Sequence, residues 1–223
     1  MPYSGIIFDF NGVLWWDAPL VEETWQVTAH KVRGRPFTAE ETAQIMHGRN
    51  NRGTMEYLAG RPLGDEEAAQ WIEEKEAYYR ELCMRQGENF RLSPGAEDLL
   101  DFLRDHRIPR TIATASIIVN VDFFVRQLRL ERWFDPGKIV YDDGILASKP
   151  APDFYLRAAE NLGLDPSRCV VVEDSLSGLR AARAAGIGRV IGLTANQPAE
   201  ALLHAGAHAT VESLGQMDRT ALF

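Results

Sequence analysis

Apolar and polar residues follow two different patterns along the chain. Residues 4–10 form a short apolar run that ends at an Asn-Gly pair, which predicts a buried strand. Residues 19–86 instead carry apolar side chains at helical spacing and almost no strand signal. Four helices are predicted in this segment, with first turns near Pro19, Thr38, Asn50 and Asp65, and with a capping box formed by Thr38 and Glu41. The last helix is expected to pack in a core through Ala68, Trp71, Ile72, Tyr79 and Leu82.

Beyond residue 88, predicted strands and helices alternate. The strands are expected at 110–114, 138–141, 168–173 and 189–193, and the helices at 94–106, 120–130, 152–162 and 176–185. This alternation predicts an α/β fold in which helices cover both faces of a parallel sheet. Because the first predicted strand precedes the helical segment, that segment is expected to be an insertion. The expected domains are an α/β core at 1–15 and 88–223 and a helical cap at 16–87.

Composition and charge exclude several classes of protein. The chain has 223 residues, of which 45% are hydrophobic and 25% charged, as in ordinary globular proteins. Its formal net charge is −8, and no run of Lys and Arg supplies the basic face that a nucleic-acid-binding protein needs. No apolar stretch approaches the roughly 18 residues that span a bilayer, and the N-terminus lacks the features of a signal peptide. The only cysteines, Cys83 and Cys169, suit a reducing compartment, so we expect a cytoplasmic monomer or weak dimer without nucleic-acid or membrane partners.

Candidate chemistry lies at the predicted strand ends, because open α/β sheets bind ligands beyond the carboxyl ends of their strands. The residues at these ends are Asp9 and Asn11 after the first strand, Thr114 and Ser116 after the second, and Glu173 and Asp174 after the fourth, with Lys149 between the last two groups. Mg²⁺ prefers oxygen ligands, and hydroxyl and ammonium groups bind phosphate oxygens. The set therefore suits a phosphate held by a hard cation. Each residue alone also suits a structural role, as a turn acid, a helix cap or a surface lysine.

Four motifs resemble those of one known family. They are Asp9-Phe-Asn-Gly-Val-Leu, Thr114-Ala-Ser, Lys149-Pro-Ala-Pro-Asp and Val172-Glu-Asp-Ser-Leu-Ser-Gly-Leu-Arg-Ala-Ala. The chain resembles the haloacid dehalogenase superfamily, and within it the β-phosphoglucomutase-like phosphatases, over nearly its whole length. The resemblance implies a Rossmann-like core with an inserted helical cap. It also implies a Mg²⁺-dependent phosphatase that acts on a small phosphorylated metabolite, with a sugar phosphate as one candidate.

The resemblance also implies roles for individual residues. Asp9 would be the nucleophile and would form an aspartyl-phosphate. The Mg²⁺ ligands would be Asp9, the backbone carbonyl of Asn11 and Asp174, with Glu173 in support. These assignments agree with the expectation that phosphoryl transfer depends mainly on positioning and charge stabilisation.

Other positions would contact the substrate. Thr114 would hold the transferring phosphoryl group, and Lys149 would neutralise it and steady the nucleophile. Ala115 and Ser116 would line the substrate site. The peptide between Lys149 and Pro150 is a candidate for the cis form, which proline makes accessible.

Residues of the cap are expected to govern the choice of substrate. His47 would contact a sugar hydroxyl, and Arg49 or Arg52 would clamp a second phosphate. The alternative for this segment is a solvated turn with two surface arginines. In the mutases a Lys-Asn pair often follows the position of Ser116, but this chain has two isoleucines there. That difference favours a simple phosphatase over a mutase.

Asn11 departs from the family pattern. Phosphatases and mutases of the family usually carry an aspartate here, which protonates the leaving group and then activates water. A carboxamide does neither, and general acid–base catalysis is typically worth about 10²–10⁴ in rate. We therefore expect a bias toward good leaving groups. The alternatives are a hexose-phosphate mutase, a binding protein for phosphate esters with impaired turnover, the metal-free dehalogenase branch, and phosphonate cleavage through a cap lysine, Lys31 or Lys75.

Overall fold

The computed structural model describes residues 2–42 and 50–223 of the chain. The chain divides into two compact units. The first, which we call the core, comprises Met1–Trp16 and Arg91–Phe223, and the second, the cap, comprises Asp17–Phe90. The boundaries expected from the sequence, residues 16 and 87, lie close to these.

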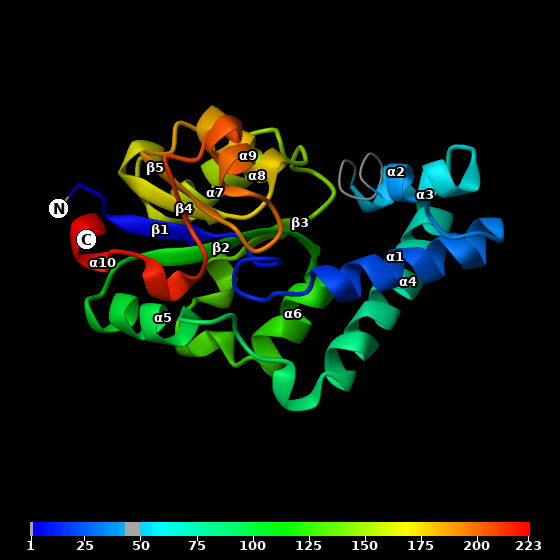
Figure 1. The fold of residues 1–223 in the computed structure, drawn as a ribbon, viewed down its shortest axis with the longest axis horizontal. Coiled ribbons are helices and arrows are strands. Elements are labelled where there is room, and N and C mark those ends of the chain that lie inside the picture. Colours follow the sequence, from blue (N-terminus) through cyan, green and yellow to red (C-terminus); the bar gives the residue numbers. More distant parts are fainter. Residues whose placement is uncertain (1, 43–49) are drawn as a thin grey trace. The chain divides into compact units, whose positions relative to one another are not determined.

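The core is built on a six-stranded parallel sheet with the strand order β3-β2-β1-β4-β5-β6 (Figure 1). The strands are β1 (Gly5–Phe8), β2 (Arg110–Ile117), β3 (Val140–Asp142), β4 (Cys169–Glu173), β5 (Arg189–Leu193) and β6 (Ala209–Val211). The predicted α/β class is therefore confirmed. The sequence pattern did not reveal β6, which has three residues and shows too little periodicity to be recognised.

Helices cover both faces of this sheet. The core helices are α5 (Ala96–Asp105), α6 (Ile118–Gln127), α7 (Asp153–Leu162), α8 (Leu176–Ala184), α9 (Ala199–Ala205) and α10 (Arg219–Leu222). Figure 1 shows α7, α8 and α9 on one face and α5, α6 and α10 on the other. This two-sided arrangement follows from right-handed crossovers that run in opposite directions from β1.

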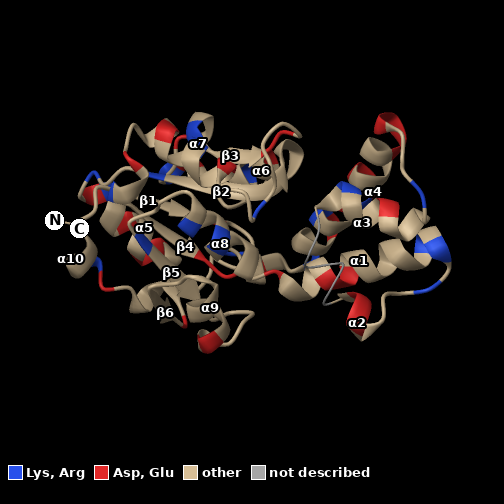
Figure 2. Ribbon diagram, turned by 90° about the horizontal axis from the view of Figure 1, so that it is seen from above, with Lys and Arg blue, Asp and Glu red and all other residues tan. Residues whose placement is uncertain are grey.

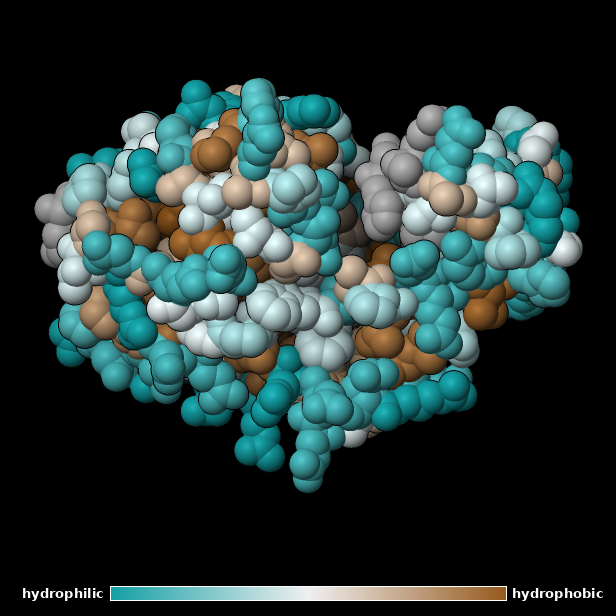
Figure 3. Space-filling view, in the orientation of Figure 1, coloured by the Kyte–Doolittle hydropathy of each residue, from teal (hydrophilic) through white to brown (hydrophobic). Residues whose placement is uncertain are grey.

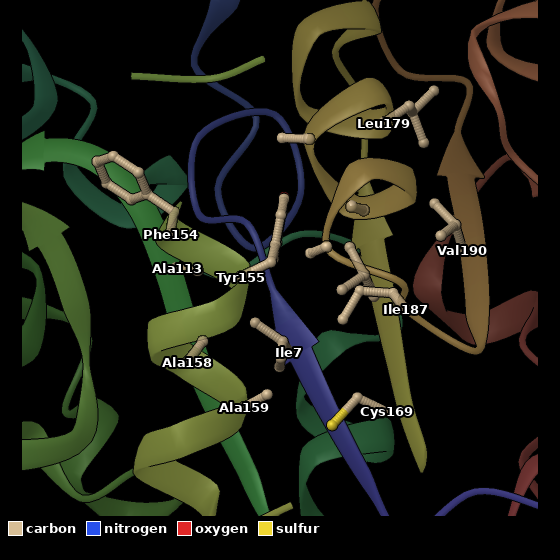
Figure 4. Close-up of a cluster of buried hydrophobic side chains, with 14 of the residues drawn as sticks. Ile7, Ala113, Phe154, Tyr155, Ala158, Ala159, Cys169, Leu179, Ile187 and Val190 are labelled. Atoms are coloured by element: carbon tan, nitrogen blue, oxygen red, sulfur yellow. The ribbon is translucent and has the colours of Figure 1, made fainter. Parts of the chain in front are cut away.

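One hydrophobic cluster joins α7, α8 and α9 to the sheet (Figure 4). Ile7 and Cys169 contribute from β1 and β4, and Ala158 and Leu179 contribute from the helices; all four are fully buried. In Figure 4, Tyr155 lies closer than Ile7 to the carboxyl end of β1. The apolar side of α7 thus brings a buried phenol toward the edge of the sheet where ligands bind in this fold.

The described residues of the cap form a small helical unit with its own core. Its helices are α1 (Ala18–Arg33), α2 (Ala39–Glu41), α3 (Asn51–Ala59) and α4 (Asp65–Arg85). The predicted capping box is confirmed, because Thr38 and Glu41 each accept a hydrogen bond from the other's backbone amide. The apolar stripe predicted for α4 also packs in the core of the cap. Ala68, Tyr79 and Leu82 are buried, and Trp71 and Ile72 are partly buried.

The surface is predominantly polar. Lys and Arg, as well as Asp and Glu, are spread over the helices (Figure 2), and hydrophilic residues cover much of the visible face of the core (Figure 3). Within residues 2–42 and 50–223, none of the helices has both the length and the apolar character that a membrane span requires.

Candidate active site

The chain reverses its direction of travel across the sheet at β1. It passes from β1 to β2 and β3, and then returns to β4 on the opposite side of β1. Ligands of doubly wound sheets bind at such a switch point, beyond the carboxyl ends of the two central strands. Phe8 of β1 pairs with Val172 of β4, and the amide of Asp9 donates a 3.0 Å hydrogen bond to the Val172 carbonyl. This register brings the acids that follow the two strands together.

Three buried carboxylates meet at this switch point. Asp9, Glu173 and Asp174 are 9%, 0% and 7% exposed, and each offers an oxygen within 4.8 Å of the others. Within residues 2–42 and 50–223, the ammonium of Lys149 forms ion pairs with two of these carboxylates, Asp9 and Glu173. A buried set of carboxylate oxygens this close together fits a hard divalent cation such as Mg²⁺.

Lys149 is bound on three sides. Its Nζ donates to Asp9 Oδ1 at 3.0 Å, to Glu173 Oε1 at 2.7 Å and to the backbone carbonyl of Ala113 at 3.3 Å. An ammonium has three protons, so these three acceptors use all of them. The peptide between Lys149 and Pro150 is cis, as the sequence suggested. The structure therefore brings the lysine directly to the candidate nucleophile.

Burial dominates the electrostatics of Asp9. Burial disfavours the charged carboxylate, and the pKa of Asp9 is raised to about 7. The negative charge of Glu173 contributes to this rise, and Lys149 offsets it only in part. Burial alone would lower the pKa of Lys149, but the two carboxylates outweigh it and raise that pKa above its ordinary value. The site thus has too little positive charge of its own to keep all its carboxylates ionised. A bound divalent cation would supply this positive charge.

Glu173 anchors the site through a full set of hydrogen bonds. Its Oε1 accepts from Lys149 and from the Tyr155 hydroxyl at 3.0 Å, and its Oε2 accepts from the amide and hydroxyl of Ser175 at 2.8 and 3.0 Å. Burial would raise the pKa of Glu173, but these donors lower it below its ordinary value. Gly178 makes room for the group, since a Cβ there would overlap the carboxylate. Glu173 therefore holds the lysine in place.

Asp174 is held from two sides. Its Oδ2 lies against Gly12, which has a positive φ of 78° and where any Cβ would overlap the carboxylate. The same oxygen accepts a 2.8 Å hydrogen bond from the side-chain amide of Asn196. Asn196 belongs to no motif, so the sequence pattern alone did not indicate it. Its position just after the fifth strand, at the same edge of the sheet, is the signal that would have found it.

Asn11 and residues in the C-terminal half of β2 form a second polar group. The Ser116 hydroxyl donates to Asn11 Oδ1 at 2.8 Å, and the Ser116 amide donates to Thr114 Oγ1 at 3.1 Å. Thr114 is buried, whereas Ala115 is exposed. The register between β2 and β3 shifts in this segment, which turns it out of the regular ladder. The structure thus joins Asn11 to the Thr-Ala-Ser motif.

Of the cap residues predicted to contact substrate, Arg52 lies in the described part of the chain. Arg52 donates from Nε to Glu56 at 3.2 Å, from Nη1 to Asp65 at 2.8 Å and from Nη2 to a backbone carbonyl at 2.8 Å. Its guanidinium is therefore engaged within the cap in this structure, and the expected role as a phosphate clamp stays a prediction. His47 and Arg49 lie outside the described residues.

The core is a doubly wound sheet with buried acids at its switch point, and a helical insertion follows its first strand. This architecture is typical of one class of hydrolases. A family model described as haloacid dehalogenase-like hydrolase matches residues 3–186. The chain belongs to the haloacid dehalogenase-like hydrolases, which confirms the resemblance seen in its motifs.

Individual relatives support the same assignment. A phosphorylated carbohydrates phosphatase from Thermotoga maritima is 33% identical over 213 residues, which cover 94% of each chain. The crystal structure of a HAD hydrolase of family IA, variant 3, from Entamoeba histolytica is 35% identical, with a TM-score of 0.90 over 98% of this chain and 97% of that one. A Thermotoga maritima structure provisionally named a β-phosphoglucomutase is 32% identical, with a TM-score of 0.69 over 96% and 95% of the two chains.

Proposed function

We propose that the protein is a Mg²⁺-dependent phosphatase that hydrolyses a small phosphorylated metabolite, of the sugar-phosphate class, through an aspartyl-phosphate on Asp9. The observation that carries this proposal is the buried cluster at the switch point, in which three carboxylates lie within 4.8 Å of one another and Lys149 binds two of them. The likeness to a phosphatase of phosphorylated carbohydrates supports the substrate class.

In the first step, a carboxylate oxygen of Asp9 attacks phosphorus, and the bond from phosphorus to the leaving oxygen breaks. Lys149 favours the ionised form of Asp9 and contributes positive charge beside the transferring group. Asp9, the Asn11 carbonyl and Asp174 would hold Mg²⁺, which when bound neutralises phosphate charge and orients the substrate. The Thr114 hydroxyl would donate to a phosphoryl oxygen.

In the second step, water attacks the aspartyl-phosphate, which releases phosphate and restores the Asp9 carboxylate. Asn11 occupies the position where the family usually has an acid. Its Oδ1 accepts a hydrogen bond from the Ser116 hydroxyl, and its carboxamide would face the leaving oxygen where the family has a carboxyl group. An amide donates a hydrogen bond there but transfers no proton near neutral pH. In the first step, the leaving oxygen therefore takes its proton from water as its bond to phosphorus breaks, which favours good leaving groups.

The test is phosphate release from a panel of sugar phosphates, p-nitrophenyl phosphate and acetyl phosphate, with Mg²⁺ and with EDTA. We expect turnover that EDTA abolishes and Mg²⁺ restores. Asp9→Asn is the matched control, because it keeps the shape of the side chain and removes the attacking carboxylate. Full activity in EDTA would instead point to the metal-free chemistry of the dehalogenases.

A second candidate is a sugar-phosphate mutase, which is favoured by the likeness to the Thermotoga maritima protein provisionally named a β-phosphoglucomutase. A mutase would need a bisphosphate primer, would convert one sugar monophosphate into its isomer and would release little phosphate. Chromatography of the sugar phosphates after incubation separates the two activities. Mutases often carry Lys and Asn at the positions where this chain has Ile117 and Ile118. This difference favours a phosphatase over a mutase.

A further inference from the structure

The loop between β5 and α9 brings a single neutral amide to the acidic cluster. Asn196 donates its side-chain N–H to Asp174 Oδ2 at 2.8 Å. It is the residue of this loop whose side chain reaches the carboxylates, within the part of the chain that the structure describes. Because it contacts a candidate metal ligand, Asn196 is a candidate for setting the orientation of the Asp174 carboxylate.

Two of the three acids of the cluster share one donor. Lys149 contacts Asp9 and Glu173 and spends its third proton on a backbone carbonyl, so it has none to give Asp174. Asn196 supplies a donor to Asp174 instead. Because an amide carries no charge, it orients the carboxylate without cancelling the negative charge that attracts a cation.

The path of the loop fixes where this amide lies. The amide and hydroxyl of Thr194 both donate to the carbonyl of Val211, at 2.9 and 3.3 Å, which ties the start of the loop to β6. Pro198 stands at the N-cap of α9, where the loop ends. Asn196 therefore lies two residues from a fixed point on each side. It is itself exposed, so its replacement leaves the hydrophobic core intact.

We propose that Asn196 is a positioning residue for Mg²⁺: it holds Asp174 Oδ2 against Gly12 and so aims the carboxylate at the metal. This inference rests on the proposed function. Groups that hydrogen-bond metal ligands typically contribute about 10–100-fold to metal affinity. We expect Asn196→Ala to weaken Mg²⁺ binding by a factor in this range.

The experiment is calorimetric titration of Mg²⁺ into the metal-free protein, for the wild type, Asn196→Ala and Gln197→Ala. Gln197 is the matched control, because it is next in the same loop and its side chain makes no hydrogen bond in residues 2–42 and 50–223. We expect the Kd for Mg²⁺ to rise about 10-fold or more in Asn196→Ala and to stay nearly constant in Gln197→Ala. Asn196→Ser, whose hydroxyl is too short to reach Asp174, provides a second removal variant should the alanine variant fold poorly.

Kinetics supply an independent measurement. The Mg²⁺ concentration for half-maximal activity should rise in Asn196→Ala, whereas kcat at saturating Mg²⁺ should stay near the wild-type value. Equal Mg²⁺ affinity in the wild type and Asn196→Ala, or a fall in kcat that saturating Mg²⁺ does not recover, overturns the role of Asn196 alone. A wild type that binds no Mg²⁺ overturns the proposed metal dependence, so the two failures are distinguishable.

Discussion

Replacing Asn11 by aspartate should add the general acid and base that this site lacks. The two side chains have the same shape, so the hydrogen bond from the Ser116 hydroxyl to Oδ1, at 2.8 Å, survives in the variant. That bond would hold one carboxyl oxygen and leave the other to exchange a proton with the leaving group and then with water. The predicted result is a large gain for poor leaving groups.

The size of the gain follows from the chemistry that becomes available. General acid–base catalysis is worth about 10²–10⁴, which corresponds to roughly 3–5 kcal/mol of activation free energy. An alkyl phosphate such as a sugar phosphate should gain within this range, because its alkoxide must be protonated as it leaves. An aryl phosphate leaves without protonation and should gain far less.

The substitution also has an electrostatic cost. It adds a carboxyl group two residues from Asp9, near a cluster that already contains three carboxyl groups. Like charges raise the pKa of neighbouring carboxyl groups, and burial already raises the pKa of Asp9 to about 7. The assay therefore compares kcat for a sugar phosphate and for p-nitrophenyl phosphate at saturating Mg²⁺, so that weaker ionisation of Asp9 does not hide the gain.

A chemical control must precede this assay. Asn11 is followed by Gly12, and an Asn-Gly sequence is prone to deamidation, which would create traces of the aspartate form in wild-type protein. Intact mass and peptide mapping measure that fraction. If unmodified wild type hydrolyses sugar phosphates rapidly and Asn11→Asp brings no gain, another group supplies the proton and our account of the site is wrong.

Three further substitutions test other parts of the structure. Asp174→Ala removes a proposed metal ligand, and calorimetry should show a sharp loss of Mg²⁺ affinity; unchanged affinity would remove Asp174 from the site. Gly178→Ala places a methyl group on the buried Glu173 carboxylate and should destabilise the fold by about 1–3 kcal/mol, measured as a lower Tm, whereas Gly64→Ala, which meets open space, should not. Arg52→Ala should leave KM unchanged for sugar and aryl phosphates alike, because its guanidinium is bound within the cap; a raised KM for the sugar phosphate alone would restore the clamp.

Local patterns predicted the architecture well. The switch from helical spacing to alternating elements identified the inserted helices and the parallel sheet, and the strand expected at 189–193 coincides with β5. The capping box at Thr38 was recognisable because its partners are three residues apart. Helix and strand periods and caps depend on neighbours within a turn or two, so they are visible in the chain itself. Elements of a few residues, such as β6, contain too little of a period to be recognised.

The partners of each polar group within the site depended on the folded chain. The resemblance implies that Glu173 supports a metal, and the folded chain adds that its oxygens are bound by Lys149, Tyr155 and Ser175, so that it also anchors the lysine. Asn196 reaches Asp174 from a loop without a motif, and this contact exists only because β4 and β5 lie side by side in a fixed register. A hydrogen bond requires its two atoms to lie about 3 Å apart, and strand register and loop path decide which distant residues meet at that distance.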